Sequence, residues 1–395
     1  MIAFLSRRSF KRDWAELDEM LDVLMSAEWR ASFRDDFGMD YVFSWFVVDL
    51  VGNFLNPRSR SLGFHEIYER YRSRLADSVC RRDRLYWHHH PPSFTREAHK
   101  TSNNFSMSNE HLQILARRII DYLDFPVAFR PGSHCERPDI NLFLEQWIPF
   151  DFGNQGREES LGESTQRDIS SGRFGDWRRA QRQWGFYHPD FHDYQVPGYM
   201  NRFIVRCLNI DSRLRVLDEE EIGKAFTQAR ERGVSLLCFT SHDEREMRPA
   251  IQTVVNQIRN CRDSEFPEVK IRFVNAVEGI RKVAGLTRQD PMNLEVALVG
   301  NQLKVCASKQ TWGPQPFFCF KLRNGQYFFE NLDFGLQPQT WSFTFDEDSV
   351  EPHDVIAVGL ASHDKVGNTV VVRGKPFEDA ASWEFKQLNS VDWLG

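Results

Sequence analysis

The sequence predicts an α/β fold over residues 1–285 and an all-β, sandwich-like module over residues 286–395. In the first part, short apolar runs alternate with segments of helical spacing, as expected for parallel strands with helices packed outside. The run Val234–Phe239 is continuously apolar, which fits a strand buried on both faces. Beyond Leu286, short strand-like segments follow one another between Gly, Asn and Pro turns, which is typical of an antiparallel module.

The helices of the first part are predicted from apolar residues that recur every three or four positions. Ser108 is the expected N-cap of the third helix, and Gly233 is the expected C-terminal residue that ends the fourth. The expected helices are Asp13–Ala27, Glu66–Ala76, Asn109–Leu123, Glu219–Arg232 and Pro249–Asn260. The expected strands are Ile2–Leu5, Tyr41–Val48, Leu85–Trp87, Pro126–Phe129, Trp147–Phe150, Val234–Thr240 and Val269–Val274.

The second part is predicted as a series of short antiparallel strands. Asn324-Gly325 is a hairpin signal, because both residues tolerate the backbone conformation of a tight turn. The expected strands are Leu294–Val299, Gln302–Ala307, Phe317–Leu322, Gln326–Phe329, Trp341–Phe345, Asp354–Leu360 and Thr369–Arg373. The polar stretch Asn154–Ser171 in the first part has no periodicity and is expected to be a long loop.

Composition limits the class of protein. The net charge of −6 argues against a nucleic-acid partner, since such proteins usually carry a basic surplus. The seven cysteines are scattered, which indicates buried thiols in a reducing compartment and no disulfide framework. No stretch approaches the ~20 apolar residues of a membrane span, and the N-terminus lacks the apolar core of a signal peptide. The sequence therefore predicts a cytoplasmic protein.

Candidate functional residues follow the expected strands, where parallel sheets and barrels gather their sites. Each of five apolar runs is followed directly by Asp, His or Arg. These residues are Asp49, His88-His89-His90, Arg130 with His134, Asp151, and Ser241-His242-Asp243. A single polar residue after a strand is unremarkable, but five in succession predict a site at this edge.

The run Trp87-His88-His89-His90-Pro91 indicates a metal site. In an extended backbone His88 and His90 point to the same side, and two imidazoles form half of a Zn²⁺ shell. The alternative is a solvated polar loop in which three histidines adjoin. A carboxylate must complete the shell, and Asp49 has the best position for it. The acidic pair Asp35-Asp36 is the alternative source of that carboxylate, and His134 is a candidate third imidazole.

The order of these motifs resembles that of the polysaccharide deacetylases, carbohydrate esterase family 4. The resemblance covers roughly residues 41–242 as a chain of short motifs, and it suggests a divergent branch found with bacterial surface-polysaccharide (O-antigen) biosynthesis. The motifs are the histidine cluster, Phe129-Arg130-Pro131-Gly132, Asp176-Trp177 and Leu237-Cys238-Phe239-Thr240-Ser241-His242-Asp243.

The resemblance implies a distorted (β/α) barrel with a divalent metal, Zn²⁺ by its ligands, at the strand C-termini. His88 and His90 would hold the metal together with Asp49. The other carried-over residues are Arg130, which would orient the catalytic carboxylate, His242, which would be the general acid, and Asp176 and Trp177, which would support and shield that acid.

The chain departs from the family pattern at two places. The family's histidine pair is four residues apart, whereas here the imidazoles are adjacent. The family's first motif is an Asp-Asp pair after the first strand, where this chain has Ser6-Arg7-Arg8.

Several of these residues also have simpler interpretations. Arg130 could pair with Asp139 or Glu136, Asp176 could be a helix N-cap, and His242-Asp243 could be an ordinary loop.

Three functional hypotheses follow. The first is a metal-dependent deacetylase that removes an acetyl or other acyl group from a sugar or polysaccharide intermediate. The second is a catalytically silent relative that binds glycan or assembles with biosynthetic partners. A third is a different metal-dependent amidohydrolase on a similar barrel. A carbohydrate is the expected ligand in the first two, and a homo-oligomer or a biosynthetic partner protein is a further expectation.

Overall fold

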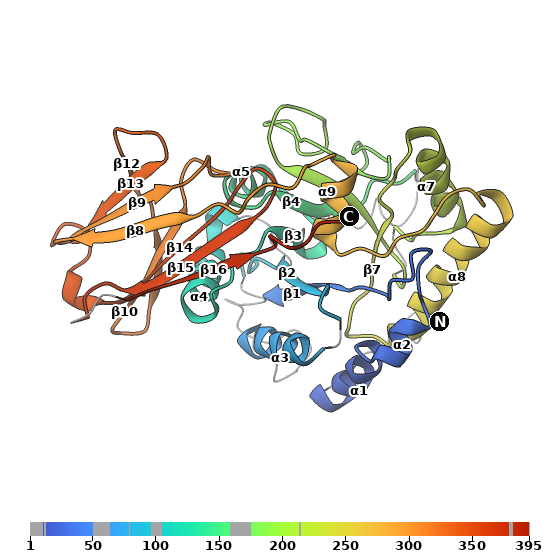
Figure 1. The fold of residues 1–395 in the computed structure, drawn as a ribbon, viewed down its shortest axis with the longest axis horizontal. Coiled ribbons are helices and arrows are strands. Elements are labelled where there is room, and N and C mark those ends of the chain that lie inside the picture. Colours follow the sequence, from blue (N-terminus) through green and yellow to red (C-terminus); the bar gives the residue numbers. More distant parts are fainter. Residues whose placement is uncertain are drawn as a thin grey trace.

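The computed structural model describes residues 11, 13–49, 64–78, 80–95, 105–158, 175–212, 215–378 and 382–394. Ile2–Leu5 and Ser6-Arg7-Arg8 lie outside the described residues. The fold is mixed α/β, with one largely parallel sheet and two antiparallel sheets (Figure 1). The antiparallel strands lie together at one end of the molecule, and α7 (Glu219–Arg232) and α8 (Arg248–Glu265) lie at the other. None of the helices in the described ranges is long and apolar enough to cross a membrane.

The parallel sheet is built in chain order. Strands β1, β2, β3, β4 and β6 are hydrogen-bonded in that sequence, all parallel, and β7 continues parallel to β6. The short β5 pairs antiparallel with β6. The strands are β1 Ser44–Asp49, β2 Arg84–His89, β3 Ala128–Pro131, β4 Phe150–Asn154, β5 Phe186–Tyr187, β6 Phe203–Asn209 and β7 Cys238–Thr240. All carboxyl ends of the parallel strands therefore meet at one edge.

Helices fill the connections between these strands. Gly233 has a φ of +81°, a left-handed conformation that suits glycine, and it ends α7 as expected. Ser108 is not a cap, because α4 begins after Asn109. The other helices are α1 Trp14–Leu24, α2 Ala27–Ala31, α3 Phe64–Asp77, α4 Glu110–Tyr122, α5 Pro138–Trp147 and α9 Ala276–Val283, with short 3₁₀ turns at Phe105–Met107, Gly132–His134 and Pro352–Asp354.

The parallel sheet is strongly curved. Phe46 on β1 contacts Phe152 on β4 with ring centroids 5.5 Å apart, although β2 and β3 lie between these strands. Both side chains belong to an apolar cluster that draws on the inner face of each parallel strand and on Val277 and Ile280 of α9. The curvature brings the C-terminal ends of distant strands toward one another, which allows a site to be shared among them.

Two antiparallel sheets form the C-terminal part and pack face to face. One has the order β11-β10-β14-β15-β16 and the other β12-β13-β9-β8, and their inner faces share one core that includes Phe318, Val358 and Phe343. The outer face of the first sheet packs on Ile119 of α4. The strands are β8 Leu294–Val299, β9 Gln302–Ala307, β10 Phe317–Leu322, β11 Tyr327–Glu330, β12 Asp333–Phe334, β13 Thr340–Thr344, β14 Val355–His363, β15 Thr369–Lys375 and β16 Ser382–Leu388.

The expected strand Val269–Val274 is not formed. The segment runs without regular structure. Its amides are bound by side chains: Asp36 Oδ2 accepts from Ile271 N at 2.6 Å, and Asp35 Oδ2 accepts from Phe273 N at 2.8 Å. These carboxylates take the place of a neighbouring strand.

Candidate functional site

Four imidazoles from three strand ends gather at the carboxyl edge of the sheet. His88 is in β2 and His90 follows it, His134 ends the turn after β3, and His242 follows β7. His88 Nε2 lies 2.9 Å from His90 Nε2. Burial is the main cause of the lowered pKa of His88, and the nearby His90, Arg130 and His242 lower this pKa further. Burial also lowers the pKa of His134, with further contributions that include those of His242 and His88.

The orientation of the His88 ring is fixed by a hydrogen bond to the backbone of the neighbouring strand. Its Nδ1 lies 2.9 Å from the carbonyl oxygen of Arg130 on the neighbouring strand. A carbonyl only accepts, so Nδ1 carries the proton and the lone pair of a neutral ring is on Nε2, which faces His90. A metal-binding histidine commonly has this arrangement, with one nitrogen held by a backbone carbonyl and the other turned to the ion.

Arg130 and His134 form a second pair beside the first. The Arg130 guanidinium donates from Nη1 to Phe152 O at 2.8 Å and from Nη2 to His134 Nδ1 at 3.0 Å. Because His134 Nδ1 accepts, the proton of its neutral ring is on Nε2, which makes that atom a donor. Ser133 and His134 both have left-handed φ values, +51° and +53°. Two such non-glycine residues in succession are strained, and strain of this kind clusters at functional sites.

Two glycines allow the backbone to close around the imidazoles. A Cβ on Gly132 would lie 2.6 Å from Cγ of His90 and 2.7 Å from the carbonyl oxygen of His89. A Cβ on Gly175 would lie 1.7 Å from the carbonyl oxygen of His134. Neither position therefore accepts a side chain without displacing a site histidine.

Gly132→Ala is expected to displace the His90 ring and to destabilise the fold by roughly 1–3 kcal/mol, the usual cost of overpacking. Gly223→Ala is the matched control, because nothing lies within 4 Å of that Cβ in α7, and a Gly→Ala change inside a helix with room for the methyl group usually stabilises by ~0.5–1 kcal/mol. Urea unfolding of both variants checks the opposite signs. Equal stabilities would show that the close approach at Gly132 is not present in solution.

Asp49 does not join His88 and His90. In the register of β1 and β2, Val48 pairs with His88 and Asp49 pairs with His89, so Asp49 lies on the opposite face of the sheet. There it accepts from Trp87 Nε1 at 2.6 Å and lies 3.5 Å from Arg118 Nη2. Burial raises the pKa of Asp49 to about 6. As placed, this carboxylate cannot complete a shell with the two imidazoles.

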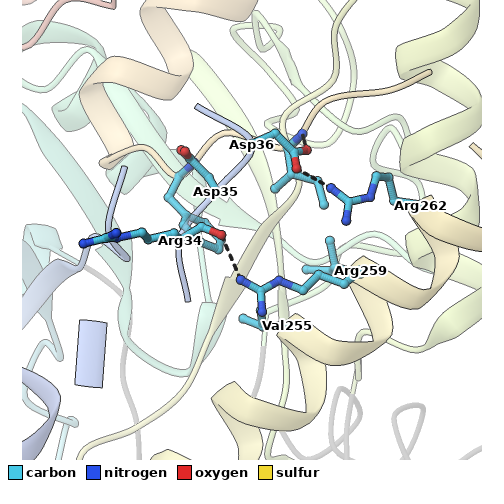
Figure 2. Close-up of a pocket in the computed structure, with 9 residues that line it drawn as sticks. Arg34, Asp35, Asp36, Val255, Arg259 and Arg262 are labelled. Atoms are coloured by element: carbon cyan, nitrogen blue, oxygen red, sulfur yellow. Dashed lines mark hydrogen bonds and ion pairs between the residues drawn. The ribbon is translucent and has the colours of Figure 1, made fainter. Parts of the chain in front are cut away.

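The acidic pair Asp35-Asp36 is also committed elsewhere (Figure 2). Asp36 forms an ion pair with Arg262, and Arg259 donates to the carbonyl oxygen of Arg34 at 2.8 Å. The residues border a cleft of about 310 Å³ beside α8. With their remaining oxygens on the amides of Ile271 and Phe273, these carboxylates have a structural role.

Asp176 and Trp177 lie directly before a turn at residues 178–179, and no helix begins there, so the N-cap interpretation is wrong. The ion pair with Arg178 is the main cause that holds the pKa of Asp176 below its usual value. Trp177 is buried, and its Nε1 donates to the carbonyl oxygen of His134 at 2.6 Å. Trp177 therefore supports the backbone of His134, whereas Asp176 is engaged with Arg178.

The loop that carries His242 is anchored on both sides. Ser241 donates to Asp211, and Tyr71 OH donates to Asp243 Oδ2 at 2.6 Å. Arg245 N donates to the carbonyl oxygen of His242 at 3.1 Å, and the Arg245 side chain is bound to Asp211. His242 is therefore held by its neighbours at the same edge as His88 and His134.

The alternative partners of Arg130 are used elsewhere. Asp139 Oδ2 accepts from Ser106 N at 2.8 Å, and Glu136 pairs with the buried Arg202. The expected role of Arg130, orienting a catalytic carboxylate, has no counterpart in the described ranges, where no carboxylate forms an ion pair with it. In the same ranges, no three His, Cys, Asp or Glu side chains form a group that could hold a metal ion.

Sequence reasoning missed Arg215. Its Nη2 donates to Gly175 O at 2.7 Å, and its charge is among the causes that lower the pKa of His134. The residue lies in the loop that follows β6, a strand that the sequence reading did not include. Recognising the run Phe203–Asn209 as a strand would have directed attention to the loop after it, which contains Arg215.

Comparisons with known proteins give no relative: no family model, no curated protein and no solved structure matches this chain.

Proposed function

We propose that this protein is a metal-dependent deacetylase that acts on an acylated sugar or polysaccharide intermediate of bacterial surface-glycan biosynthesis. The curved parallel sheet would then be the distorted (β/α) barrel of the polysaccharide deacetylases. The observation that supports the proposal best is the convergence of His88 Nε2 and His90 Nε2, 2.9 Å apart, with His88 Nδ1 on the carbonyl of Arg130. Further ligands would have to come from outside this pair.

The donor set fits a divalent metal in part. Two neutral imidazole nitrogens turned toward one another suit Zn²⁺, which takes histidine readily. When bound, such an ion polarises an acyl carbonyl and acidifies a water molecule. His134, with its proton on Nε2, can donate a hydrogen bond to a developing oxyanion. His242 lies near both His88 and His134 and can hold the proton that a leaving oxygen or nitrogen needs.

The second candidate function is glycan binding without catalysis. The observation that favours it is the position of Asp49, which faces Trp87 and Arg118 on the other side of the sheet. Among the described residues no carboxylate is grouped with the imidazoles, and without one the deacetylase reaction would lack the base that family members place there. The same polar edge would still bind sugar hydroxyls. Cytoplasmic location, a homo-oligomer and a biosynthetic partner stay predictions from the sequence.

The test is the metal content of the purified full chain, measured by elemental analysis. Wild type is expected to hold about one equivalent of divalent metal, and the His88→Ala/His90→Ala double variant is expected to hold none. His353→Ala is the matched control, because this side chain is 74% exposed in the C-terminal part, and it should keep the metal.

Wild-type protein that takes up no metal, or a double variant that keeps it, would reject the metal site, and glycan binding would be the next function to test. If the metal is present and lost as expected, release of acetate from acetylated sugars should be lost in the same variant.

A further inference from the structure

Strand β16 (Ser382–Leu388) is an edge of the five-stranded antiparallel sheet. Its seven residues pair with β15, from Leu388 opposite Thr369 to Ser382 opposite Lys375, and the strand order of the sheet ends there. Among the described residues, no backbone hydrogen bond reaches β16 from any segment other than β15. The peptide groups that point away from β15 are therefore open to a further strand.

Phe385, at the centre of β16, is left half exposed. It is paired in register with Val372, which lies in the core between the two antiparallel sheets. Residues directly opposite one another in a sheet point to the same face, so Phe385 faces this core as well. Its ring is nevertheless 53% exposed, whereas Trp383 on the same face packs partly buried against the core. A strand added beside β16 would cover part of the Phe385 ring.

The other face of β16 carries one acid and one base. Arg373, the register partner of Glu384, donates to the carbonyl oxygen of Ile120 in α4 at 3.0 Å. Glu384 and Lys386 therefore share the face that is turned toward α4. Both contacts of Arg373 with Glu384 are to Oε2, at 2.7 and 2.9 Å, which leaves Oε1 for a second cation. Lys386 is exposed and forms no ion pair within the described part of the chain.

This order of residues is self-complementary. When two copies of β16 pair antiparallel about Phe385, the phenylalanine lies opposite its own copy and Glu384 lies opposite Lys386 of the partner subunit. Opposite charges and aromatic rings directly across an antiparallel pair both stabilise it, and two-fold symmetry makes the charge contact occur twice. Strand β8, an edge of the second antiparallel sheet, has Glu295 as its only charged residue and offers no such match.

We infer that two copies of this chain form a two-fold symmetric dimer in which β16 pairs antiparallel with β16 of the partner subunit, centred on Phe385. The two five-stranded sheets then become one continuous sheet. This dimer does not depend on the proposed function, and it gives the homo-oligomer expected from the sequence a defined interface. A single strand is a small interface beside the ~800 Å² per partner of a standard complex, so the dimer is expected to be reversible and to form at micromolar concentrations.

The experiment is sedimentation velocity of the full chain at concentrations from about 1 to about 200 µM, where wild type is expected to change from monomer to dimer. Lys386→Glu places like charges opposite one another twice in the dimer and should raise the dissociation constant about tenfold or more. Glu384→Lys should have the same effect. Lys304→Glu is the matched control, because Lys304 is exposed on β9, away from this edge, and it should dimerise as wild type does.

A mixture of the two edge variants distinguishes this interface from any other. In a mixed dimer both charge contacts join an acid to a base again, so Lys386→Glu and Glu384→Lys together should dimerise about as tightly as wild type, although each alone does not. Wild type that stays monomeric up to about 200 µM overturns the inference, as does a mixture of folded variants that does not dimerise. If Glu384→Lys, which also loses the pair with Arg373, does not fold, equal dimerisation of Lys386→Glu and Lys304→Glu overturns it.

Discussion

Replacing Arg202 by methionine is expected to destabilise the protein by about 3–5 kcal/mol, because it leaves two buried carboxylates without their cation. Arg202 is 0% exposed. It forms an ion pair with Glu136, donates to the carbonyl and the side-chain oxygen of Asn141 at 2.7 and 2.8 Å, and lies 3.5 Å from Asp151. Burial raises the pKa of Glu136 even with the arginine in place, and the loss of Arg202 removes its only strong opposing influence.

Urea unfolding measures the effect. Arg34→Met is the matched control, because the Arg34 side chain is 63% exposed and pairs with an exposed Asp40, so the loss should stay below ~1 kcal/mol. Adding Glu136→Gln to Arg202→Met should restore part of the stability, since it removes one of the stranded charges. An Arg202→Met protein as stable as Arg34→Met would contradict the buried network.

This network also explains how the outer face of the sheet is held. Glu145 of α5 accepts from the amides of Asn201 and Arg202, at 2.5 and 3.0 Å, just before β6 begins. The Arg202 side chain donates to Glu136, which lies 66 residues earlier in the chain, and so connects the start of β6 to that segment. On the outward side of β4, Asp151 thus lies beside Arg202, whereas the inward side of the strand ends holds imidazoles and Arg130.

The elements that the sequence predicts well carry local signals. Helix α7 has the expected bounds, with Asp218 accepting from Glu221 N at its start and Gly233 at its end. Strands β8, β9 and β10 also have the expected bounds, and the Asn324-Gly325 turn joins β10 to β11. The spacing of apolar residues and the turn residues are enough to predict the bounds of such elements, because these signals lie within a few positions of the chain.

The elements that the sequence reading omitted lack such a signal. Strand β6 contains Arg206, which is fully buried against Glu221 and interrupts an otherwise apolar run. Helix α9 has only eight residues, and α5 begins with Pro138 and Asp139. The opposite error is Val269–Val274, where the alternation is genuine but the amides pair with Asp35 and Asp36.

In the candidate site, too, sequence patterns predicted the local arrangement and not the arrangement between strands. Alternation alone predicted that His88 and His90 share a side, and their Nε2 atoms do converge. It could not place Asp49 relative to them, since the register between two strands depends on pairing across the sheet, and a shift of one residue reverses the face. Arg130 was expected to meet a carboxylate of the chain, and the observed partners are a carbonyl and an imidazole.

The contact between the C-terminal sheets and the parallel sheet should weaken in acid through His363. This residue ends β14, and its ring is fully buried and stacks on Phe125 at 5.0 Å. Its Nδ1 lies 2.8 Å from Thr369 Oγ1 and its Nε2 lies 3.2 Å from the carbonyl oxygen of Pro126. Burial lowers the pKa of His363 to about 3.

The sign follows from proton uptake. Below pH ~6.5 the imidazole of the unfolded chain binds a proton that the folded chain does not bind until about pH 3. The stability that His363 contributes is therefore complete above 6.5 and is lost as the pH falls toward 3, at about 1.4 kcal/mol per pH unit. At pH 5 the expected loss is ~2 kcal/mol.

His363→Gln removes this titration. The variant is expected to be less stable than wild type at pH 7.5, because it loses the stacked ring, and the difference should shrink by ~2 kcal/mol at pH 5. Thr369→Ser keeps both the hydroxyl and the imidazole, so it should follow the wild-type pH dependence. Urea unfolding at the two pH values measures all three proteins, and a difference between wild type and His363→Gln that does not change with pH would show that His363 is accessible to protons in the folded state.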